Sequence, residues 1–321
     1  MSEYPLVSII CLCYNHEKFL EEALLSIINQ EYPNKEIILI DDCSSDFSVD
    51  VIRKFLVHHP EIFFIANEKN IGNCSAFNSG FEISKGEFII DFATDDVMLP
   101  DKIKKQVEKF LSLPENYGVV YSDAEIIDDK GLFLAYHHKG TKRASFHPEG
   151  DIFNDILRKY FICPPTMMIK RLVLEKSGGY NLGHAYEDFN LWITSSRNFY
   201  YGFIPDILMR RRVVKNSLSM SFFTKNNSEI FQTTLEVLTT ASELCRNKEE
   251  LASLVYRIKF EMKHAFFMEE FIVAEGYRKM LVQMNSYDKL SSLLYFLSTK
   301  KVHMFWLYKY VLRYKGFYSL R

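Results

Sequence analysis

The chain lacks three features that would place it in a specialised structural class. Its six cysteines form no CxxC pair and are too sparse for a disulfide framework, so we expect neither a zinc site nor an oxidising compartment. No segment approaches the roughly 20 apolar residues that a membrane-spanning helix needs. No internal repeat or low-complexity tract is present. Apolar residues still make up 48% of the chain, which is ample for a globular core.

The chain also lacks a large net charge of either sign. The net charge of −2 over 321 residues gives no reason to expect nucleic acid as a partner. The amino-terminal stretch MSEYPLVSIICLCYN has no basic region ahead of its short apolar run, so it predicts a first β-strand and not a signal peptide. We therefore expect a cytoplasmic protein, attached at most to the inner surface of the membrane.

Two glycine-rich motifs that bind phosphate are missing as well. Neither GxGxxG nor GxxxxGK[ST] occurs, which argues against a Rossmann dinucleotide site and against a P-loop. A nucleotide phosphate would need a different counter-charge on this chain. A divalent metal held by carboxylates is the obvious candidate.

The order of apolar and amphipathic stretches predicts an α/β fold. From Val7 to about Asp128, β-branched apolar runs such as VSIICLC and KEIILID alternate with helical patterns such as EKFLEEALLSIINQ. Such alternation indicates a parallel sheet with helices on both faces, a doubly wound domain. From about residue 222 the chain reads as mostly helical. We expect a catalytic domain over 1–220, with halves at 1–125 and 126–220, and a helical region over 221–321.

Pairs of acidic residues follow two of the predicted strands. Asp41 and Asp42 end the second strand, and Asp95 and Asp96 follow the fourth. Ligands of such sheets bind beyond the carboxyl ends of the strands. Adjacent carboxylates near a buried strand end repel each other and are costly unless a cation is close. These pairs therefore indicate a ligand site.

Helix capping is the alternative interpretation of these acids. Asp101 or the pair Asp95 and Asp96 could begin the helix in LPDKIKKQVEKF. The stretch DDCSSD could likewise be a capped turn before the helix that starts near Val49, with Ser44, Ser45 and Asp46 as the caps. Capping explains Asp101 well and explains a repelling pair poorly. For DDCSSD, capping and ligand binding are compatible.

Four stretches of the chain resemble glycosyltransferase family 2, the inverting GT-A enzymes, over roughly residues 5 to 220. They read VSIICLCYNHEKFLEEALLSIINQEYPNKEIILIDDCSSD, NEKNIGNCSAFNSGFEISKGEFI, FATDDVMLPDKI and SGGYNLGHAYEDFNLW. The resemblance implies the GT-A fold, a Rossmann-like and mostly parallel sheet, here with a helical C-terminal extension. It also implies an enzyme of hexosyltransferase type that transfers a sugar from a nucleotide-sugar donor to a hydroxyl group.

The resemblance assigns roles in donor binding to five residues. Asp96 is the expected ligand of Mg²⁺ or Mn²⁺, and Asp95 is a second metal ligand or a contact to ribose or diphosphate. Asp42 is expected to accept a hydrogen bond from the uracil imide, and Tyr14 to pack on the base. Asn70 is expected near the nucleotide.

The resemblance also assigns the catalytic base. Asp188, in AYEDFNLW, is expected to take the proton of the acceptor hydroxyl as its oxygen attacks the anomeric carbon. The alternative is that Glu187 and Asp188 only cap the helix that follows. Arg212 is expected to contact the diphosphate, with a surface role as the alternative.

Four positions depart from the family pattern. Ala93 stands where the commoner form has a carboxylate, Leu12 replaces a frequent threonine, Phe77 a frequent arginine, and Val214 a histidine. Uridine is the expected base, with thymidine and guanosine left open. The departures also leave open a second hypothesis, a catalytically silent relative that binds nucleotide sugar or glycan in an assembly complex.

The last segment, residues 300–321, carries six basic residues and no acidic one. Its aromatic residues, Trp306, Tyr310, Tyr314 and Phe317, would share one face of a helix. This pattern suits the interface of an anionic membrane, where lipid-linked glycan acceptors reside, or an aromatic stripe that packs on the protein itself. The expected setting is synthesis of surface polysaccharide or glycolipid. A homodimer is left open, and the sequence does not identify the sugar, acceptor or linkage.

Overall fold

The computed structural model describes residues 4–137, 147–184, 186–214 and 228–308, and these form two compact units. The sheet unit comprises residues up to 152, 161–182 and 198–212. The helical unit comprises residues 153–160, 183–197 and 213 onward. We expected a domain boundary near residue 220, whereas the compact units divide the chain earlier, because two short helices of the central region belong with the C-terminal helices.

Four parallel strands form the first half of the sheet. They are β1 (Val7–Cys13), β2 (Lys35–Asp41), β3 (Phe63–Ala66) and β4 (Phe88–Ala93), in the order β3-β2-β1-β4. Every residue of β1 is buried, including those that point to opposite faces. That explains why the run VSIICLC is continuously apolar instead of alternating with polar residues. The expected doubly wound architecture is confirmed.

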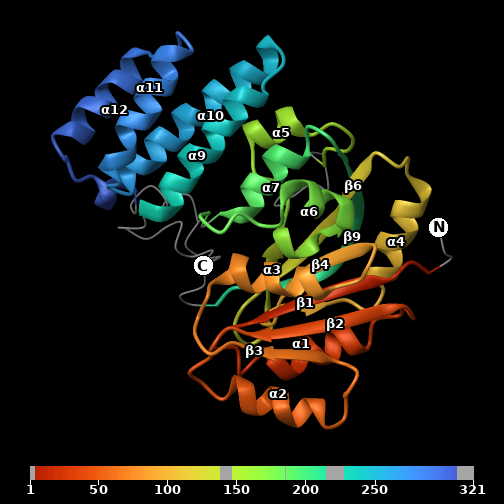
Figure 1. Ribbon diagram of the computed structural model, residues 1–321. Helices are drawn as coiled ribbons and strands as arrows, with labels where there is room; N and C mark the ends of the chain where they lie inside the picture. Colours follow the sequence, from red (N-terminus) through yellow and green to blue (C-terminus); the bar gives the residue numbers. More distant parts are fainter. Residues whose placement is uncertain (1–3, 138–146, 185, 215–227, 309–321) are drawn as a thin grey trace. The chain divides into compact units, whose positions relative to one another are not determined.

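Helices cover both faces of this half of the sheet (Figure 1). They are α1 (Leu20–Ile28) and α2 (Ser48–Leu56) on one face and α3 (Asn73–Ile83) on the other. Ile9 and Cys11 belong to the same core as Leu24 of α1. On the opposite face, a Cβ atom on Gly80 of α3 would lie 2.7 Å from Cγ2 of Ile10. Glycine at this position therefore lets α3 approach the sheet closely.

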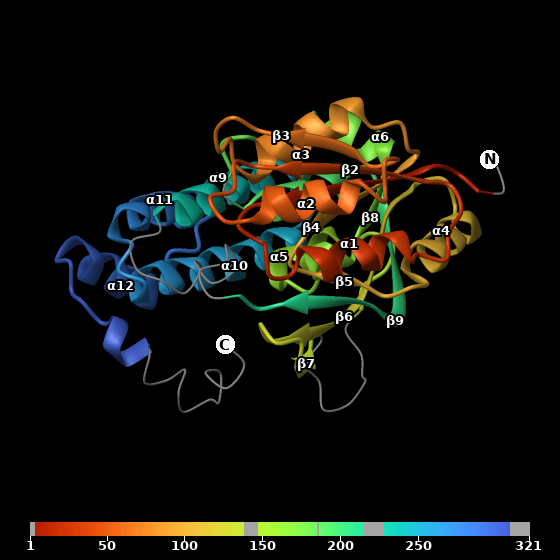
Figure 2. The ribbon, with the colours of Figure 1, turned by 90° about the horizontal axis from the view of Figure 1, so that it is seen from below.

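The second half of the sheet contains strands of both directions. Its elements are β5 (Val97–Met98), α4 (Lys102–Ser112), β6 (Tyr117–Ile127), β7 (Phe133–Tyr136), η1 (Pro164–Thr166), β8 (Met168–Lys170), α6 (Arg171–Ser177) and β9 (Tyr200–Arg212). β8 runs antiparallel between β4 and β6, while β9 runs parallel to β6. β5 pairs with β9 (Figure 2). The last residues of β9 therefore return to the turn between β4 and β5.

The helical unit contains the following helical segments among the residues that the structure describes. They are α5 (Phe153–Arg158), α7 (Glu187–Ser195), α9 (Ser228–Leu244), α10 (Lys248–Phe267), η2 (Phe271–Val273), α11 (Ala274–Gln283) and α12 (Lys289–Thr299). Asn247 caps α10 by accepting a hydrogen bond from the amide of Glu250 at 2.9 Å, and Asp288 caps α12 in the same way. The expected helical extension is thus confirmed, and no described helix is long and apolar enough to cross a bilayer.

A buried lysine makes the stability of the sheet unit depend on pH. Lys102 is fully buried, and its Nζ donates to Oε1 of Gln106 at 2.8 Å and to the carbonyl of Met167 at 3.4 Å. Burial lowers the pKa of Lys102 from 10.5 to about 7. Between these values the unfolded chain binds more protons than the folded one, so the free energy of unfolding rises with pH. Below pH 7 the full cost of burying the charge applies.

We predict that Lys102→Met stabilises the protein most at acidic pH, because the variant buries no charge. The difference in unfolding free energy from the parent should shrink above about pH 7, by up to about 1.4 kcal/mol per pH unit. Urea unfolding of both proteins at about pH 6, 8 and 9.5 measures it. A difference that does not change with pH would show that Lys102 keeps an ordinary pKa in the folded protein.

Candidate active site

The carboxyl ends of three parallel strands bring most of the predicted site residues to one edge of the sheet. Cys13 of β1 pairs with Asp41 of β2, and Leu12 pairs with Ala93 of β4, so the strands end at the same level. Tyr14 and Asp42 follow directly, and the turn of residues 94–96 follows β4. The pleated register alone therefore places the two acidic pairs on neighbouring loops of the sheet unit.

The turn that carries Asp95 and Asp96 is tied to the first strand through Thr94. This side chain is fully buried, and both its amide and its Oγ1 donate to the carbonyl of Leu12, at 3.0 and 3.1 Å. Nδ1 of His16 lies 2.9 Å from the same Oγ1. Neither Thr94 nor His16 was singled out from the sequence, because their roles depend on β1 and β4 being neighbours.

Capping of α4 does not account for the acidic pair. The residue before the first turn of α4 is Asp101, and its side chain makes no capping hydrogen bond. It forms an ion pair with Lys105 instead, with Oδ2 at 2.5 Å from Nζ. Asp95 and Asp96 precede the short strand β5 and are separated from α4 by it. A ligand therefore remains the better explanation of the pair.

Asp96 is held in an environment that disfavours its charge. It is 5% exposed, and its Oδ1 accepts a hydrogen bond from the amide of Arg212 at 2.7 Å. Burial is the largest cause that raises the pKa of Asp96 well above its ordinary value, and repulsion from Asp95 is the second. Arg211 and Arg212 oppose this shift. A cation bound between the two carboxylates would relieve both the burial cost and the repulsion.

The pair has the donor chemistry that a hard divalent cation needs. Among the described residues, none donates a hydrogen bond to the carboxylate of Asp95, and the described residues include no group of three His, Cys, Asp or Glu side chains able to hold a metal alone. Mg²⁺ and Mn²⁺ commonly take one or two carboxylates and complete their coordination with water and substrate phosphate. Asp95 and Asp96 therefore fit a cation that arrives with a phosphate ligand.

Asp42 organises the loop after β3. Its Oδ1 accepts from Nδ2 of Asn67 and from the amide of Ile71, both at 2.9 Å, and its Oδ2 accepts from the amide of Gly72 at 2.8 Å. Asn70 is exposed on this loop. A carboxylate has about four acceptor positions, so one on Oδ2 is left by these three donors. The structural role of Asp42 was not foreseen, because its donors follow a different strand.

The loops after β1 and β2 are joined by side chains of both. Oδ1 of Asn15 accepts from the amide of Ser45 at 2.8 Å, and the amide of Asn15 donates to Oγ of Ser44 at 2.9 Å. Tyr14 lies beside this junction and is 48% exposed. Asp46 accepts from the amide of Ser48 at 2.9 Å, at the start of α2. The stretch DDCSSD is therefore a structured turn. The residue before α2 is Phe47 and makes no side-chain capping hydrogen bond, so the expected caps do not cap this helix.

The glycine-containing loop after α6 is fixed by Asn78 of α3. Nδ2 of Asn78 donates to the carbonyl of Tyr180, and Oδ1 accepts from its amide, both at 2.8 Å. A Cβ atom on Gly179 would lie 2.5 Å from Oδ1 of Asn78, so only glycine fits there. Phe77 is fully buried and its ring packs against Tyr180. The residue in the arginine position of the family is thus part of the core.

Asp188 lies in the helical unit, in the first turn of α7. Tyr186 precedes the helix and makes no side-chain capping bond. The helix is anchored by aromatic contacts, in which the ring of Tyr160 packs edge-on against Tyr186 and Phe189. Trp192 of the same helix is 1% exposed and belongs to the core. Asp188 and the acidic pair belong to different units, so their sharing of one site stays a prediction.

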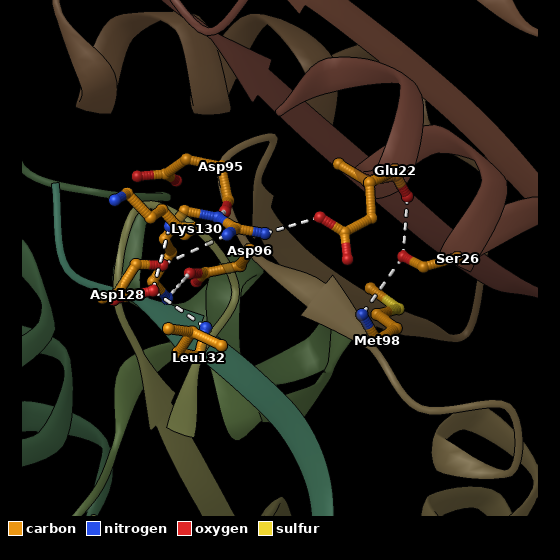
Figure 3. A network of polar contacts seen from close by, with 10 residues as sticks. Glu22, Ser26, Asp95, Asp96, Met98, Asp128, Lys130 and Leu132 are labelled. Carbon is orange, nitrogen blue, oxygen red and sulfur yellow. Dashed lines mark hydrogen bonds and ion pairs between the residues drawn. The ribbon is translucent and has the colours of Figure 1, made fainter. Parts of the chain in front are cut away.

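Arg212 ends β9 inside the sheet unit and is 4% exposed. Its guanidinium contacts the main-chain oxygens of Asp95 and Asp128 and the carboxylate of Glu22. Figure 3 labels these three partners. The predicted contact to a diphosphate stays a prediction.

A mostly parallel sheet that gathers acidic loops at the carboxyl ends of its strands has its ligand site at that edge. Residues 8–178 match the family described as glycosyl transferase family 2, and the chain belongs to this family. It is therefore a glycosyltransferase.

Relatives and solved structures agree with this assignment. An uncharacterized glycosyltransferase of Methanocaldococcus jannaschii is 27% identical over 76% of this chain and 83% of its own length. An uncharacterized glycosyltransferase of Haemophilus influenzae is 29% identical over 71% of each chain. The structure of S. aureus TarS residues 1–349 matches with a TM-score of 0.65 at 15% identity, over 92% of this chain and 87% of its own. That likeness confirms the GT-A fold.

We predict that Asp42→Asn destabilises the sheet unit. The asparagine amide would turn N–H groups toward at least one of three N–H donors, and an unsatisfied buried polar group costs about 1–3 kcal/mol. Urea unfolding measures the loss. Asp50→Asn is the matched control, because Asp50 is exposed on α2, and it should change the unfolding free energy by less than about 0.5 kcal/mol. Equal stability of the two variants would contradict the anchoring role of Asp42.

Proposed function

We propose that this glycosyltransferase is an inverting, metal-dependent enzyme that moves a sugar from a UDP-sugar donor to a hydroxyl of a glycan or lipid-linked glycan. The observation that carries the proposal is the buried Asp96 beside Asp95, at the strand edge that also presents Asp42 and Tyr14. Repelling acids of this kind at a buried turn are stable when a cation lies between them. In this fold, that position is where a donor diphosphate would lie.

Donor binding is proposed for the loops after β1, β2 and β3. The exposed ring of Tyr14 offers a face for the base, and the remaining acceptor position of Asp42 suits the imide N–H of uracil. Asn70 is proposed as a nucleotide contact on the loop that Asp42 anchors. Structures of other proteins support a nucleotide-sugar donor in general, since TarS was solved with UDP-GlcNAc and the mannosyltransferase PcManGT of Pyrobaculum calidifontis with GDP-Man and Mn²⁺.

Asp95 and Asp96 are proposed to hold Mn²⁺ or Mg²⁺ together with the donor diphosphate. When bound, the cation supplies positive charge that stabilises the departing nucleoside diphosphate. The protein keeps Asp96 buried and hydrogen-bonded to the amide of Arg212, so that one carboxylate is fixed, while Asp95 is only partly buried. Rigid placement of this kind preserves the metal geometry during the reaction.

Asp188 is proposed as the base of the transfer. Its carboxylate takes the proton of the acceptor hydroxyl while the acceptor oxygen forms a bond to C1 of the sugar. The bond between C1 and the diphosphate oxygen breaks on the opposite face, which inverts the anomeric configuration, and C1 gains oxocarbenium character in between. One base on the acceptor side is sufficient for this chemistry. The aromatic packing of α7 gives Asp188 a rigid support.

We place this reaction in the synthesis of surface polysaccharide or glycolipid on the cytoplasmic side of the membrane. A Bacillus subtilis relative, TuaG, named as a candidate glycosyltransferase of teichuronic acid biosynthesis, is 26% identical over 67% of this chain. Of the basic segment 300–321, the structure describes residues 300–308. Lys300 and Lys301 are exposed and Trp306 is 67% exposed, which supports a membrane contact. Tyr308 packs on Phe267, which supports the alternative of packing on the protein.

A catalytically silent relative is the second candidate. Ala93 stands where the commoner family form has an acid. Phe77, which is buried, stands where many family members have an arginine. Such a protein would bind nucleotide sugar without turnover. The retention of Asp95, Asp96 and Asp188 favours the enzyme.

We predict that Asp188→Asn abolishes sugar transfer and spares donor binding. Loss of the base should lower kcat by about 10²–10⁴-fold, because the acceptor proton then has no recipient. UDP release from UDP-sugars with Mn²⁺ measures turnover, and calorimetry measures UDP affinity. Asp50→Asn serves as the control and should keep full activity. Turnover that survives in Asp188→Asn would remove this residue from the mechanism, and absence of turnover in the parent protein across donors and acceptors would favour the silent relative.

We predict that Lys300→Glu with Lys301→Glu weakens binding to vesicles containing anionic lipid. Each lysine near such a surface contributes about 1 kcal/mol, so reversing two charges should reduce partitioning by at least about tenfold. Co-sedimentation with anionic and zwitterionic vesicles measures the effect. The control is Lys159→Glu with Lys248→Glu, which reverses two exposed charges elsewhere in the helical unit. Unchanged partitioning of the first variant would rule out the membrane role of this segment.

A further inference from the structure

Arg212 makes several contacts within the protein at the end of β9. Its Nε donates to the carbonyl of Asp95 at 2.9 Å, its Nη1 to the carbonyl of Asp128 at 3.2 Å, and its Nη2 to Oε2 of Glu22 at 2.6 Å. The guanidinium also lies over the ring of Phe19, 4.8 Å from its centroid. One side chain thus joins the turn after β4, the turn after β6 and helix α1.

The main chain of the same residue holds the other acid. The amide of Arg212 donates to Oδ1 of Asp96 at 2.7 Å. Arg212 therefore donates two hydrogen bonds to the turn, one to the carbonyl of Asp95 and one to the carboxylate of Asp96. The pairing of Val97 with Arg210 places β9 beside the turn, so these two hydrogen bonds follow from the sheet register.

These contacts leave the guanidinium little capacity for a ligand. Three of its five N–H groups already donate to protein oxygens, and its side chain is 2% exposed. Only two N–H groups remain for a diphosphate, on a side chain that is almost inaccessible to solvent. Arg210 differs, because its side chain is 45% exposed and, within the described part of the chain, forms an ion pair only with Glu125, at 3.0 Å. The chemistry of the two arginines is the same, and only their surroundings separate them.

We propose that Arg212 is a positioning residue that holds Asp95 and Asp96 in the arrangement that binds the divalent cation, and that it does not contact the diphosphate. This inference rests on the proposed function. Lysine at this position would keep the positive charge but could not reach three acceptors on different segments, because its single ammonium lacks the planar fork of arginine. The acidic turn would then lose its link to α1 and to the turn after β6.

The test uses the full chain and compares Arg212→Lys with the matched control Arg210→Lys. Mn²⁺ affinity is measured by electron paramagnetic resonance in the presence of saturating UDP, and metal-free affinities for UDP and uridine are measured by calorimetry. We expect Arg212→Lys to weaken Mn²⁺ binding by roughly 10–100-fold, as for other residues that orient metal ligands, and to leave both metal-free affinities within about twofold. Arg210→Lys should change none of them.

Glu22→Gln provides a second, milder variant, since Glu22 is 54% exposed on its side chain and its exchange removes only the charge of one acceptor. We expect it to weaken Mn²⁺ binding by a smaller factor in the same direction, so the test does not depend on the folding of Arg212→Lys, which thermal unfolding monitors. Equal Mn²⁺ affinity in the parent, Arg212→Lys and Glu22→Gln would overturn the positioning role. A selective loss of UDP affinity relative to uridine in Arg212→Lys would overturn it in favour of a diphosphate contact. Absence of Mn²⁺ binding in the parent protein would refute the metal dependence of the proposed function. This outcome is distinguishable from a failure of the positioning role, in which the parent still binds Mn²⁺.

Discussion

The repulsion between two adjacent carboxylates at a buried strand end is the constraint on which the site depends. Asp96 is nearly inaccessible to water, and Asp95 is its neighbour in the chain, so neither charge is fully hydrated there. A fixed amide donor and nearby arginines offset part of the free-energy cost of placing these two charges together. A bound cation would offset the rest of this cost. The surrounding elements keep this unfavourable arrangement in place: Thr94 on one side and β9 on the other.

Polar side chains of the sheet unit serve mainly to tie loops together. Asn15 joins the loops after β1 and β2, Asp42 anchors the loop after β3, and Asn78 clamps the glycine loop after α6. Each of these residues satisfies main-chain groups of a distant segment. The loops around the strand edge are thereby held together by hydrogen bonds within the protein, as a preformed binding site requires.

The helical unit supports Asp188 by different means. Helix α7 packs in an aromatic cluster, and Arg257 of α10 lies 3.4 Å above the ring of Tyr160 in that cluster. Arg257 also pairs with Glu261 at 2.9 Å within a buried setting. Such a buried ion pair contributes little net stability but holds its neighbours in one arrangement. The proposed base thus lies on a helix that packs against aromatic rings of the helical unit.

The sequence by itself determined the parallel sheet, the helical extension and the location of the acids, because strand periodicity and the order of the family's stretches are local patterns. It did not reveal that Phe77 belongs to the core, that Lys102 is buried, or that Asp42 and Arg212 act as anchors. Those roles need partners from segments such as Glu22 and Gly72, far away in the chain. Only the sheet register and the packing of α1 and α3 bring these atoms within hydrogen-bonding distance, and a linear pattern contains no information on such distances.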